Sequence, residues 1–270
     1  MRTLGIRGAL VVTVLLAGPG LAGPGPAAAQ GCPPPRALVD TVLGMKYCTD
    51  PAFSGAVDTL TLRLRQEARA ARQAGRLVIY MSTPISPRGG GVEKVNVEIA
   101  AAVKARLEKV YGGGAWILDP GAHQMPSIGA KSPGGGDYMV MFTRVLAGDD
   151  GAGRDFDMAH FTGPGDMRAF FGCSGDDITG CLGRWLAGRA AADADLKRVA
   201  DNPETRRAFL RYYAMRASAA HSAGAHDEWN IFVRINRKRT LGDQISMFFD
   251  GRAASPAEME TEISPGYEVR

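Results

Sequence analysis

Three observations on the sequence predict an α/β fold, which is a Rossmann-like sheet with flanking helices. Residues 77–86 form an apolar run that stops abruptly at small hydroxyl residues and a proline, as a buried parallel strand does when it delivers polar side chains to the ligand-binding edge of a sheet. Residues 96–110 carry apolar side chains at helical spacing and 115–118 form a second short strand, so the three elements make a βαβ unit with a right-handed crossover. A helix at 137–146 and a third strand at 156–161 continue the alternation.

The first 29 residues are expected to be a secretory signal peptide rather than part of this fold. Arg2 and Arg7 precede an apolar run at 9–17, and three alanines ending at Ala29 offer a cleavage site. The apolar run is too short for a transmembrane helix, and no later segment is apolar enough to span a bilayer. The mature protein is therefore expected in the periplasm or outside the cell. Lipidation of Cys32 is a minor alternative, because the residues before it loosely resemble a lipoprotein cleavage box.

The charge of the mature protein gives little support for nucleic-acid binding. Cleavage after Ala29 removes two arginines and lowers the formal net charge from +4 to +2. The remaining Lys and Arg residues are scattered along the predicted helices rather than gathered in one stripe. We therefore expect a small-molecule ligand as the partner and no nucleic acid, and the pattern leaves the oligomeric state open.

Four cysteines remain after cleavage and fall into two pairs that are close in sequence. Of the three pairings that four cysteines allow, Cys32 with Cys48 and Cys173 with Cys181 is favoured for that reason. Neither pair has CxxC spacing, which argues against a thioredoxin-like motif and against a zinc knuckle. Two disulfides that staple loops of an exported protein are the expected result.

Residues 30–75 are expected to form a disulfide-stapled segment followed by a helix. Residues 57–64 alternate apolar and polar side chains as a strand would, but 66–71 are rich in Ala, Arg and Gln, which favour a helix. Gly75 is expected to end this helix. The Rossmann-like core then follows at 76–180.

Within the core, capping and turn residues mark where the elements begin and end. Asn96 can cap the first helix, and Asp119 follows the second strand directly. Asp137 suits the N-terminus of the next helix, where a negative charge is favoured. After the third strand, a glycine-rich turn at 162–166 leads into a short helix at 167–171.

The last third of the chain, residues 181–270, is expected to form a helical and β C-terminal extension. Two helices are predicted at about 181–200 and 203–220, the second with a proline in its first turn. Residues 229–237 alternate apolar and polar side chains, which predicts a strand with one solvated face, and 244–249 could pair with it as a hairpin. The tail from Ala253 to Arg270 is expected to be irregular.

Short motifs recur in a fixed order along residues 77–171. They are Ile79–Ile85, Asn96, Ile117–Pro120, Asp137–Met139 with Leu146, and Gly163–Asp166. In this order and spacing they resemble the nucleoside 2-deoxyribosyltransferase-like family, whose members have a Rossmann-like α/β fold. The resemblance implies cleavage or exchange of N-glycosidic bonds by a carboxylate that attacks the anomeric carbon, because a sugar leaving its base resembles an oxocarbenium ion.

The resemblance also implies which carboxylates to consider. The family carries its nucleophilic glutamate in a glycine-rich segment that opens the helix after the third strand, and the corresponding residues 163–168 contain no glutamate. Asp166 could substitute for it, and Asp137 is the next candidate because the resemblance puts it near the sugar-binding edge. His160 could act as an acid or base there. The structural alternatives are a helix cap for Asp137 and a buried structural histidine for His160.

Seven residues near the predicted edge of the sheet are expected to contact the substrate through hydroxyl, amide, carboxyl or backbone groups. They are Tyr80, Ser82, Thr83, Asn96, Asp119, Tyr138 and Gly163. Ser82 and Thr83 could instead cap the turn at the following proline, and Asn96 could simply cap its helix. Glycine runs at 89–91 and 134–136 could expose N–H groups to an anion, or could be flexible surface loops.

Three function classes follow. The first is an exported hydrolase or transferase that acts on a nucleoside, a nucleotide or a related N-glycoside. The second is an exported module that binds a ligand or has a structural role without catalysis. The third is a metal-dependent hydrolase centred on His221 and His226, although the spacing is not HExxH and no other His-rich segment completes a site. The primary prediction includes no metal ion and no cofactor.

Overall fold

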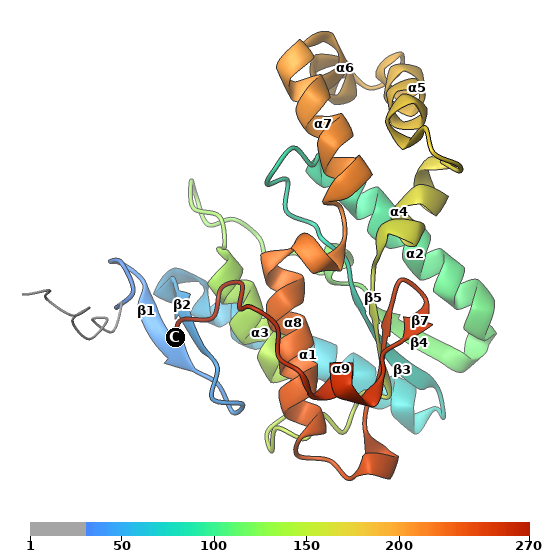
Figure 1. Cartoon of the computed structure of the whole chain (residues 1–270). Coiled ribbons are helices and arrows are strands. Elements are labelled where there is room, and N and C mark those ends of the chain that lie inside the picture. Colours follow the sequence, from blue (N-terminus) through green and yellow to red (C-terminus); the bar gives the residue numbers. More distant parts are fainter. Residues whose placement is uncertain (1–30) are drawn as a thin grey trace, which may run out of the picture. The chain divides into compact units, whose positions relative to one another are not determined.

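A five-stranded sheet organises the part of the chain that the computed structural model describes, residues 31–270. The predicted signal peptide lies outside these residues. The strands are β3 (Leu77–Ser82), β4 (Ala115–Leu118), β5 (Met158–Phe161), β6 (Ser246–Phe249) and β7 (Arg252–Ala253). Their order is β4-β3-β5-β6-β7, with β7 antiparallel and the others parallel. Figure 1 labels β3, β4, β5 and β7 of this sheet. The predicted Rossmann-like α/β fold is confirmed.

The strand order places a topological switch point between β3 and β5. The chain moves from β3 outward to β4, then returns across β3 to β5 and continues to β6. The connection that follows β3 therefore runs towards one edge of the sheet, and the connection that follows β5 runs towards the other edge. Such a reversal opens a crevice beyond the carboxyl ends of β3 and β5. Ser82 and Phe161, the last residues of β3 and β5, are partners in the register. A ligand site is expected beside them.

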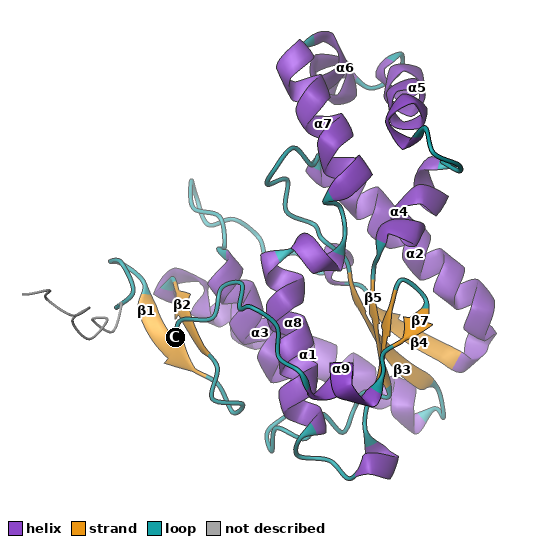
Figure 2. Cartoon of the chain, in the orientation of Figure 1, coloured by secondary structure: helices purple, strands orange, loops and turns teal. Residues whose placement is uncertain are grey.

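Helices cover both faces of the sheet (Figure 2). One face packs against α1 (Ser54–Gln73), α3 (Gly135–Ala147) and α8 (Ala223–Asn236), whose buried side chains form one apolar core. The other face packs against α2 (Glu93–Tyr111) and α4 (Pro164–Phe171) in a second core. A sheet buried on both faces explains why β3 reads as a continuous apolar run.

Three further helices extend the second core into a helical lobe, residues 178–215. They are α5 (Ile178–Ala190), α6 (Ala194–Asp201) and α7 (Pro203–Met215). The expected single helix at 181–200 is therefore wrong, because Asp193 begins a new helix by accepting hydrogen bonds from the N–H groups of Asp195 and Leu196.

The N-terminal part of the described chain is a β-hairpin followed by a helix. Strands β1 (Ala37–Asp40) and β2 (Lys46–Thr49) pair antiparallel, and β2 packs against α3. Residues 57–64, whose alternation resembled a strand, lie within α1, so the helical propensity of the following residues decided the outcome. Helix α2 begins at Glu93 and α3 at Gly135, two or three residues before the expected starts.

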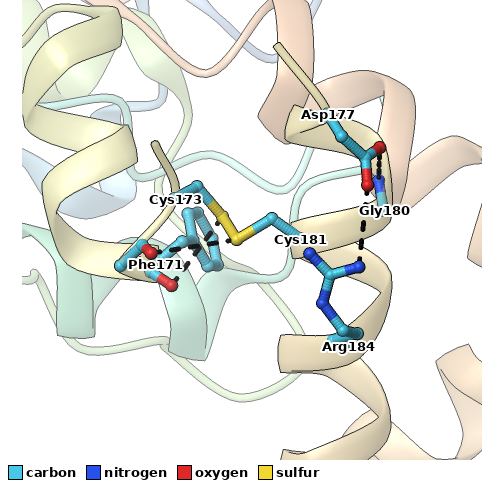
Figure 3. The surroundings of a disulfide bond; sticks show 7 residues. Phe171, Cys173, Asp177, Gly180, Cys181 and Arg184 are labelled. Atoms are coloured by element: carbon cyan, nitrogen blue, oxygen red, sulfur yellow. Dashed lines mark hydrogen bonds and ion pairs between the residues drawn. A yellow bond between two sulfur atoms is a disulfide. The ribbon is translucent and has the colours of Figure 1, made fainter. Parts of the chain in front are cut away.

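Both predicted disulfides are present. Cys32 is bonded to Cys48, which ties the segment before β1 to β2. Cys173 is bonded to Cys181 and joins the end of α4 to α5 (Figure 3). Asp177 caps α5 by accepting a hydrogen bond from Gly180 N at 2.8 Å. Such bonds form in oxidising compartments, as expected for a protein outside the cytoplasm.

The predicted strand at 229–237 is wrong, since 229–236 belong to α8 and Arg237 is the C-cap of that helix. Apolar and polar residues alternate in this segment because α8 is buried on nearly every side, so that buried positions hold asparagines as well as apolar residues. Asn230 exchanges two hydrogen bonds with the backbone of Ile263, and Asn236 does the same with Ile245. Polar side chains that pair with backbone groups inside the protein resemble a solvated face in the sequence.

The expected pairing of 244–249 with 229–237 fails for the same reason. Strand β6 instead lies parallel to β5 and forms a hairpin with β7. A C-terminal hairpin is therefore present, with a different second strand. The region expected to be irregular after β7 includes α9 (Pro256–Glu260), which Ser255 caps with Glu258 in a capping box. None of the helices formed by residues 31–270 is long and apolar enough to cross a membrane.

The two disulfides make a direct prediction. Protein purified from an oxidising compartment should show no alkylated cysteine unless a reductant is added, and peptide mapping should recover Cys32 with Cys48 and Cys173 with Cys181. Replacing both Cys32 and Cys48 with Ser should lower the free energy of unfolding by about 3 kcal/mol, because the bond closes a loop of intermediate length. Four labelled thiols in the unreduced protein would contradict both bonds.

Candidate functional site

A cavity of about 400 Å³ lies beside the switch point. Its walls come from the loop after β3, the start of α3, the start of α8 and the segment 261–270. The lining residues that carry polar or charged groups include Thr83, Arg88, Glu93, Tyr138, Glu228 and Tyr267. Cavities of this size hold small-molecule ligands, and the location is the one that open parallel sheets use for binding.

Glu228 is the buried carboxyl of this cavity. Its side chain projects from the first half of α8, and the residue is only 6% exposed. Burial raises the pKa of Glu228 from its ordinary value to about 7, and the nearby charge of Asp227 acts in the same direction. The hydroxyls of Ser82 and Tyr80 oppose this rise by favouring the ionised form. A carboxyl whose pKa lies near neutrality suits a group that exchanges charge during a reaction.

Tyr80 and Ser82 reach Glu228 from β3. Both residues are fully buried on the core face that α8 covers. Their hydroxyls lie near enough to the Glu228 carboxyl to stabilise its charge, yet neither makes a hydrogen bond of ordinary geometry to any group within residues 31–270. Burial and the Glu228 charge raise the pKa of Tyr80 well above its usual range, so this hydroxyl stays protonated and can donate. Buried hydroxyls without an ordinary hydrogen-bond partner are rare in native cores, and both of these lie beside one carboxyl.

The ring of Tyr80 is fixed by aromatic packing. It makes edge contacts with Phe142 of α3 and Phe156 before β5, at centroid distances of 5.8 and 6.5 Å. Phe232 of α8 lies 5.6 Å away on another side. This packing limits movement of the ring and holds the hydroxyl in place beside Glu228.

The loop between β3 and α2 forms one wall of the cavity and is held from below. Asn96 Nδ2 donates hydrogen bonds to the carbonyl oxygens of Ile85 and Ser86, at 3.0 and 3.2 Å. The Tyr213 hydroxyl of α7 in turn donates to Asn96 Oδ1 at 2.8 Å. Asn96 therefore does not cap α2, whose N-cap is Val92, but fixes the loop that carries Arg88.

Glycines 90 and 91 let this loop approach the helical lobe closely. A methyl group on Gly90 would overlap the backbone of Ala208 in α7, and one on Gly91 would overlap the ring of Tyr212. The run 89–91 is therefore a close contact and not a free surface loop. The helical lobe contributes to the site by positioning this wall.

Thr83 and Tyr138 are predicted contact residues that line the cavity. The Thr83 hydroxyl lies 2.6 Å from that of Thr162, so the two link the ends of β3 and β5 at the switch point. The Tyr138 hydroxyl donates to Gln124 Oε1 and accepts from Met125 N, which fastens the loop before α3.

Asp137, Asp119 and Gly163 do not line the cavity. The Asp137 carboxylate accepts hydrogen bonds from the N–H groups of Gly134 and Asp50, at 2.7 and 2.9 Å, so it caps α3 and fastens the chain after β2 to that helix. Asp119 accepts from Gly121 N at 2.8 Å, and burial raises its pKa. Gly163 N donates to Asp166 at the start of α4.

Asp166 and His160 lie together on the opposite face of the sheet from Glu228. His160 Nε2 is 3.0 Å from Asp166 Oδ2, and Arg106 of α2 pairs with the other carboxylate oxygen. Burial alone would raise the pKa of Asp166, but His160 and the Gly163 N–H hold it below its usual value. Asp250 meanwhile accepts hydrogen bonds from the first N–H groups of α4. This cluster is satisfied internally and joins α2, β5 and α4.

The histidines near α8 do not gather a metal site. No three His, Cys, Asp or Glu side chains among residues 31–270 lie close enough together to hold a metal ion. The ring nitrogens of His226 lie 3.0 and 2.9 Å from the carbonyl oxygens of Ser264 and Ala220. His226 therefore links backbone segments, and the metal-dependent alternative has no support in this part of the chain.

Glu228, Arg88 and Tyr267 were missed by sequence reasoning. Glu228 lies directly before residues 229–237, whose alternation predicts a strand, so the sequence pattern does not place it in a helix. The signal that could have found it is Ser222, whose hydroxyl caps α8 by accepting a hydrogen bond from Ala225 N. A serine cap before a helix would have placed Glu228 in the second turn.

Comparison with known proteins adds no relative: no family model matches the sequence, and no curated protein and no solved structure matches it either. The case for this site therefore depends on its geometry. Its central feature is one buried carboxyl, faced by two buried hydroxyls, in a cavity at the switch point of a parallel sheet.

The raised pKa of Glu228 predicts how its replacement changes stability. Because the folded protein favours the neutral form, the carboxyl costs stability increasingly from its ordinary pKa of 4.5 up to about 7, and by a constant amount above that. Glu228→Gln should therefore be more stable than the wild type at pH 8, by at most about 3 kcal/mol. At pH 4 the two proteins should be nearly equal. Chemical denaturation at both pH values measures the difference.

A matched control is Glu260→Gln, which neutralises an exposed glutamate at the end of α9. It should change stability little at either pH. A Glu228→Gln variant that is no more stable than the wild type at pH 8 would show that burial of the ionised Glu228 carboxyl does not lower the free energy of unfolding.

Proposed function

We propose that the protein is an exported enzyme that hydrolyses or transfers the N-glycosidic bond of a nucleoside, a nucleotide or a related N-glycoside, with Glu228 as its working carboxylate. The observation that carries this proposal is the Glu228 carboxyl, buried at the cavity beside the switch point with its pKa raised to about 7. The two disulfides and the expected signal peptide agree with action outside the cytoplasm.

The resemblance of the first strand and its turn supports this reaction class. Tyr80 and Ser82 belong to the motif Ile79–Ile85, and both face the Glu228 carboxyl. A glutamate is missing from residues 163–168, where the family pattern expects one. In this proposal Glu228 supplies the carboxylate from a different element, the helix that precedes the fourth parallel strand.

The proposed chemistry has two steps. A Glu228 oxygen bonds to the anomeric carbon while the C–N bond breaks, and the electron pair of that bond leaves with the base, which takes a proton from solvent. Water or an acceptor hydroxyl then attacks the anomeric carbon, loses its proton to solvent and restores the free carboxylate. In this proposal the Tyr80 and Ser82 hydroxyls, which lie beside the carboxylate, turn to donate to it and so stabilise it as a leaving group in the second step.

A panel of nucleosides, nucleoside monophosphates and NAD tests the proposal. Purified protein should release free base from at least one of them, as measured by chromatography. Glu228→Gln should lower the rate at least about 100-fold, whereas Glu260→Gln should retain it. Asp137→Asn and Asp166→Asn should lose stability more than turnover, since both carboxylates are engaged in helix caps outside the cavity. Turnover that survives in Glu228→Gln but not in Asp137→Asn or Asp166→Asn would contradict the assignment.

The pH dependence of the reaction provides a second test. An attacking carboxylate must be ionised, and Glu228 loses its proton at about pH 7. We expect kcat/KM to rise with pH and to level off above that value. A rate that falls over the same range would assign Glu228 the role of a proton donor. Ligand-induced stabilisation without any release of base would favour a binding protein over an enzyme.

A further inference from the structure

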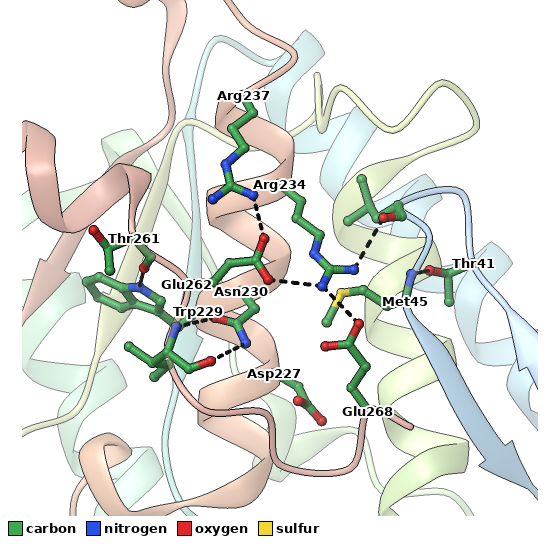
Figure 4. Close-up of polar contacts among 12 residues, drawn as sticks. Thr41, Met45, Asp227, Trp229, Asn230, Arg234, Arg237, Thr261, Glu262 and Glu268 are labelled. Atoms are coloured by element: carbon green, nitrogen blue, oxygen red, sulfur yellow. Dashed lines mark hydrogen bonds and ion pairs between the residues drawn. The ribbon is translucent and has the colours of Figure 1, made fainter. Parts of the chain in front are cut away.

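The segment 261–270, which follows α9, returns along α8 and is tied to it by side chains (Figure 4). Asp227 accepts hydrogen bonds from the N–H groups of Gly266 and Tyr267, at 2.8 and 2.7 Å. Arg234 lies two helical turns further along α8 and pairs with Glu268 at 2.9 Å. Burial raises the pKa of Asp227, and the two N–H donors oppose this rise. This return segment is therefore fixed to the helix that carries Glu228.

The close fit of the return segment places Tyr267 in the cavity wall. A methyl group on Gly266 would overlap the backbone of Ala223 at the start of α8, and one on Gly135 would overlap the Tyr267 ring at the start of α3. Tyr267 lines the same cavity as Glu228. Two glycines thus allow an aromatic ring to fill the space between the first turns of α3 and α8.

Arg88 lies over one face of the Tyr267 ring. Its guanidinium carbon lies 5.6 Å from the centroid of that ring, and Arg88 lines the cavity as well. No carboxylate within residues 31–270 forms an ion pair with Arg88. Because Arg88 is exposed and has no ion-pair partner among these residues, a planar group can take the place of its planar guanidinium against this ring face.

We propose that Tyr267 determines specificity by stacking on the planar aromatic leaving group of the substrate, and that Asp227 is the residue that positions it. This inference rests on the proposed function, because it assigns the base-binding part of the same site. Asp227 and Glu228 are neighbours in α8, so one helix sets the distance between the aromatic wall and the carboxyl. Stacking on an aromatic side chain tolerates different bases, since each presents a flat π face.

Kinetics of Tyr267 variants test the stacking role. Tyr267→Leu should raise KM for a substrate with an aromatic base about tenfold with little change in kcat, and Tyr267→Phe should behave as the wild type. The same sugar carrying fluoride as the leaving group should show no change in KM with either variant, because fluoride cannot stack. An equal rise in KM for both substrates would overturn the stacking role.

The positioning role has its own pair of variants. Gly266→Ala should displace the return segment without altering any group that contacts substrate, and it should raise KM selectively for the aromatic substrate, as should Asp227→Asn. Gly242→Ala is the matched control, since a methyl group there meets no other atom. Unchanged KM in Gly266→Ala would overturn the positioning role.

Binding of free bases separates this inference from the proposed reaction. Calorimetry with adenine and nicotinamide on Glu228→Gln should show binding that is weakened about tenfold by a second substitution, Tyr267→Leu. Such binding without turnover of any substrate would remove the proposed reaction and retain the aromatic subsite. Turnover that does not depend on Tyr267 would remove the subsite and retain the reaction, and neither binding nor turnover would overturn both.

Discussion

The burial of helix α8 is the constraint on which the site depends. This helix packs against the sheet on one side and the return segment on another, so its polar side chains must find partners inside the protein. Asn236 pairs with the backbone that leads into β6, while Asn230 and Asp227 pair with the return segment. Glu228 differs from these residues, because it faces a cavity and the groups beside its carboxyl are the hydroxyls of Tyr80 and Ser82.

Helix α8 therefore carries two kinds of buried polar side chain: those that hold the fold together and the one at the candidate site. A buried polar group that is fully paired stabilises a unique packing, whereas a buried carboxyl with raised pKa costs stability at neutral pH. Such a cost is common where a group must change its charge during a reaction. The Asp166 cluster on the opposite face makes a useful contrast, because His160, the Gly163 N–H and Arg106 hold the pKa of Asp166 below its ordinary value.

The helical lobe and the return segment, both outside the Rossmann-like elements, complete the cavity. Tyr213 of the lobe acts through Asn96 to fix the loop after β3, and Tyr267 closes the side next to α3. The region after β5 therefore forms part of the candidate site. It supplies the carboxyl, one aromatic wall and the support of another wall.

The sequence by itself determined the elements whose signals are local. The apolar run of β3, the helical spacing of α2 and the nearby cysteine pairs predicted the sheet, its flanking helices and both disulfides. Of the contact residues that the sequence predicts, Thr83 after β3 and Tyr138 of α3 line the cavity, whereas Tyr80 and Ser82 lie behind its lining, beside Glu228. Asp137 was correctly recognised as suited to a helix N-terminus.

Only the tertiary structure decided which carboxyl meets these residues. Glu228 is distant from β3 in sequence, and its neighbours Asn230 and Asn236 resembled a solvated strand face because their backbone partners lie in other segments. The pKa of Glu228 likewise depends on how deeply α8 is buried and on two hydroxyls from β3. The local pattern of apolar and polar residues determines which helices and strands form. The environment of a buried side chain is set by residues that are distant in sequence, and in this protein their packing around Glu228 creates the site.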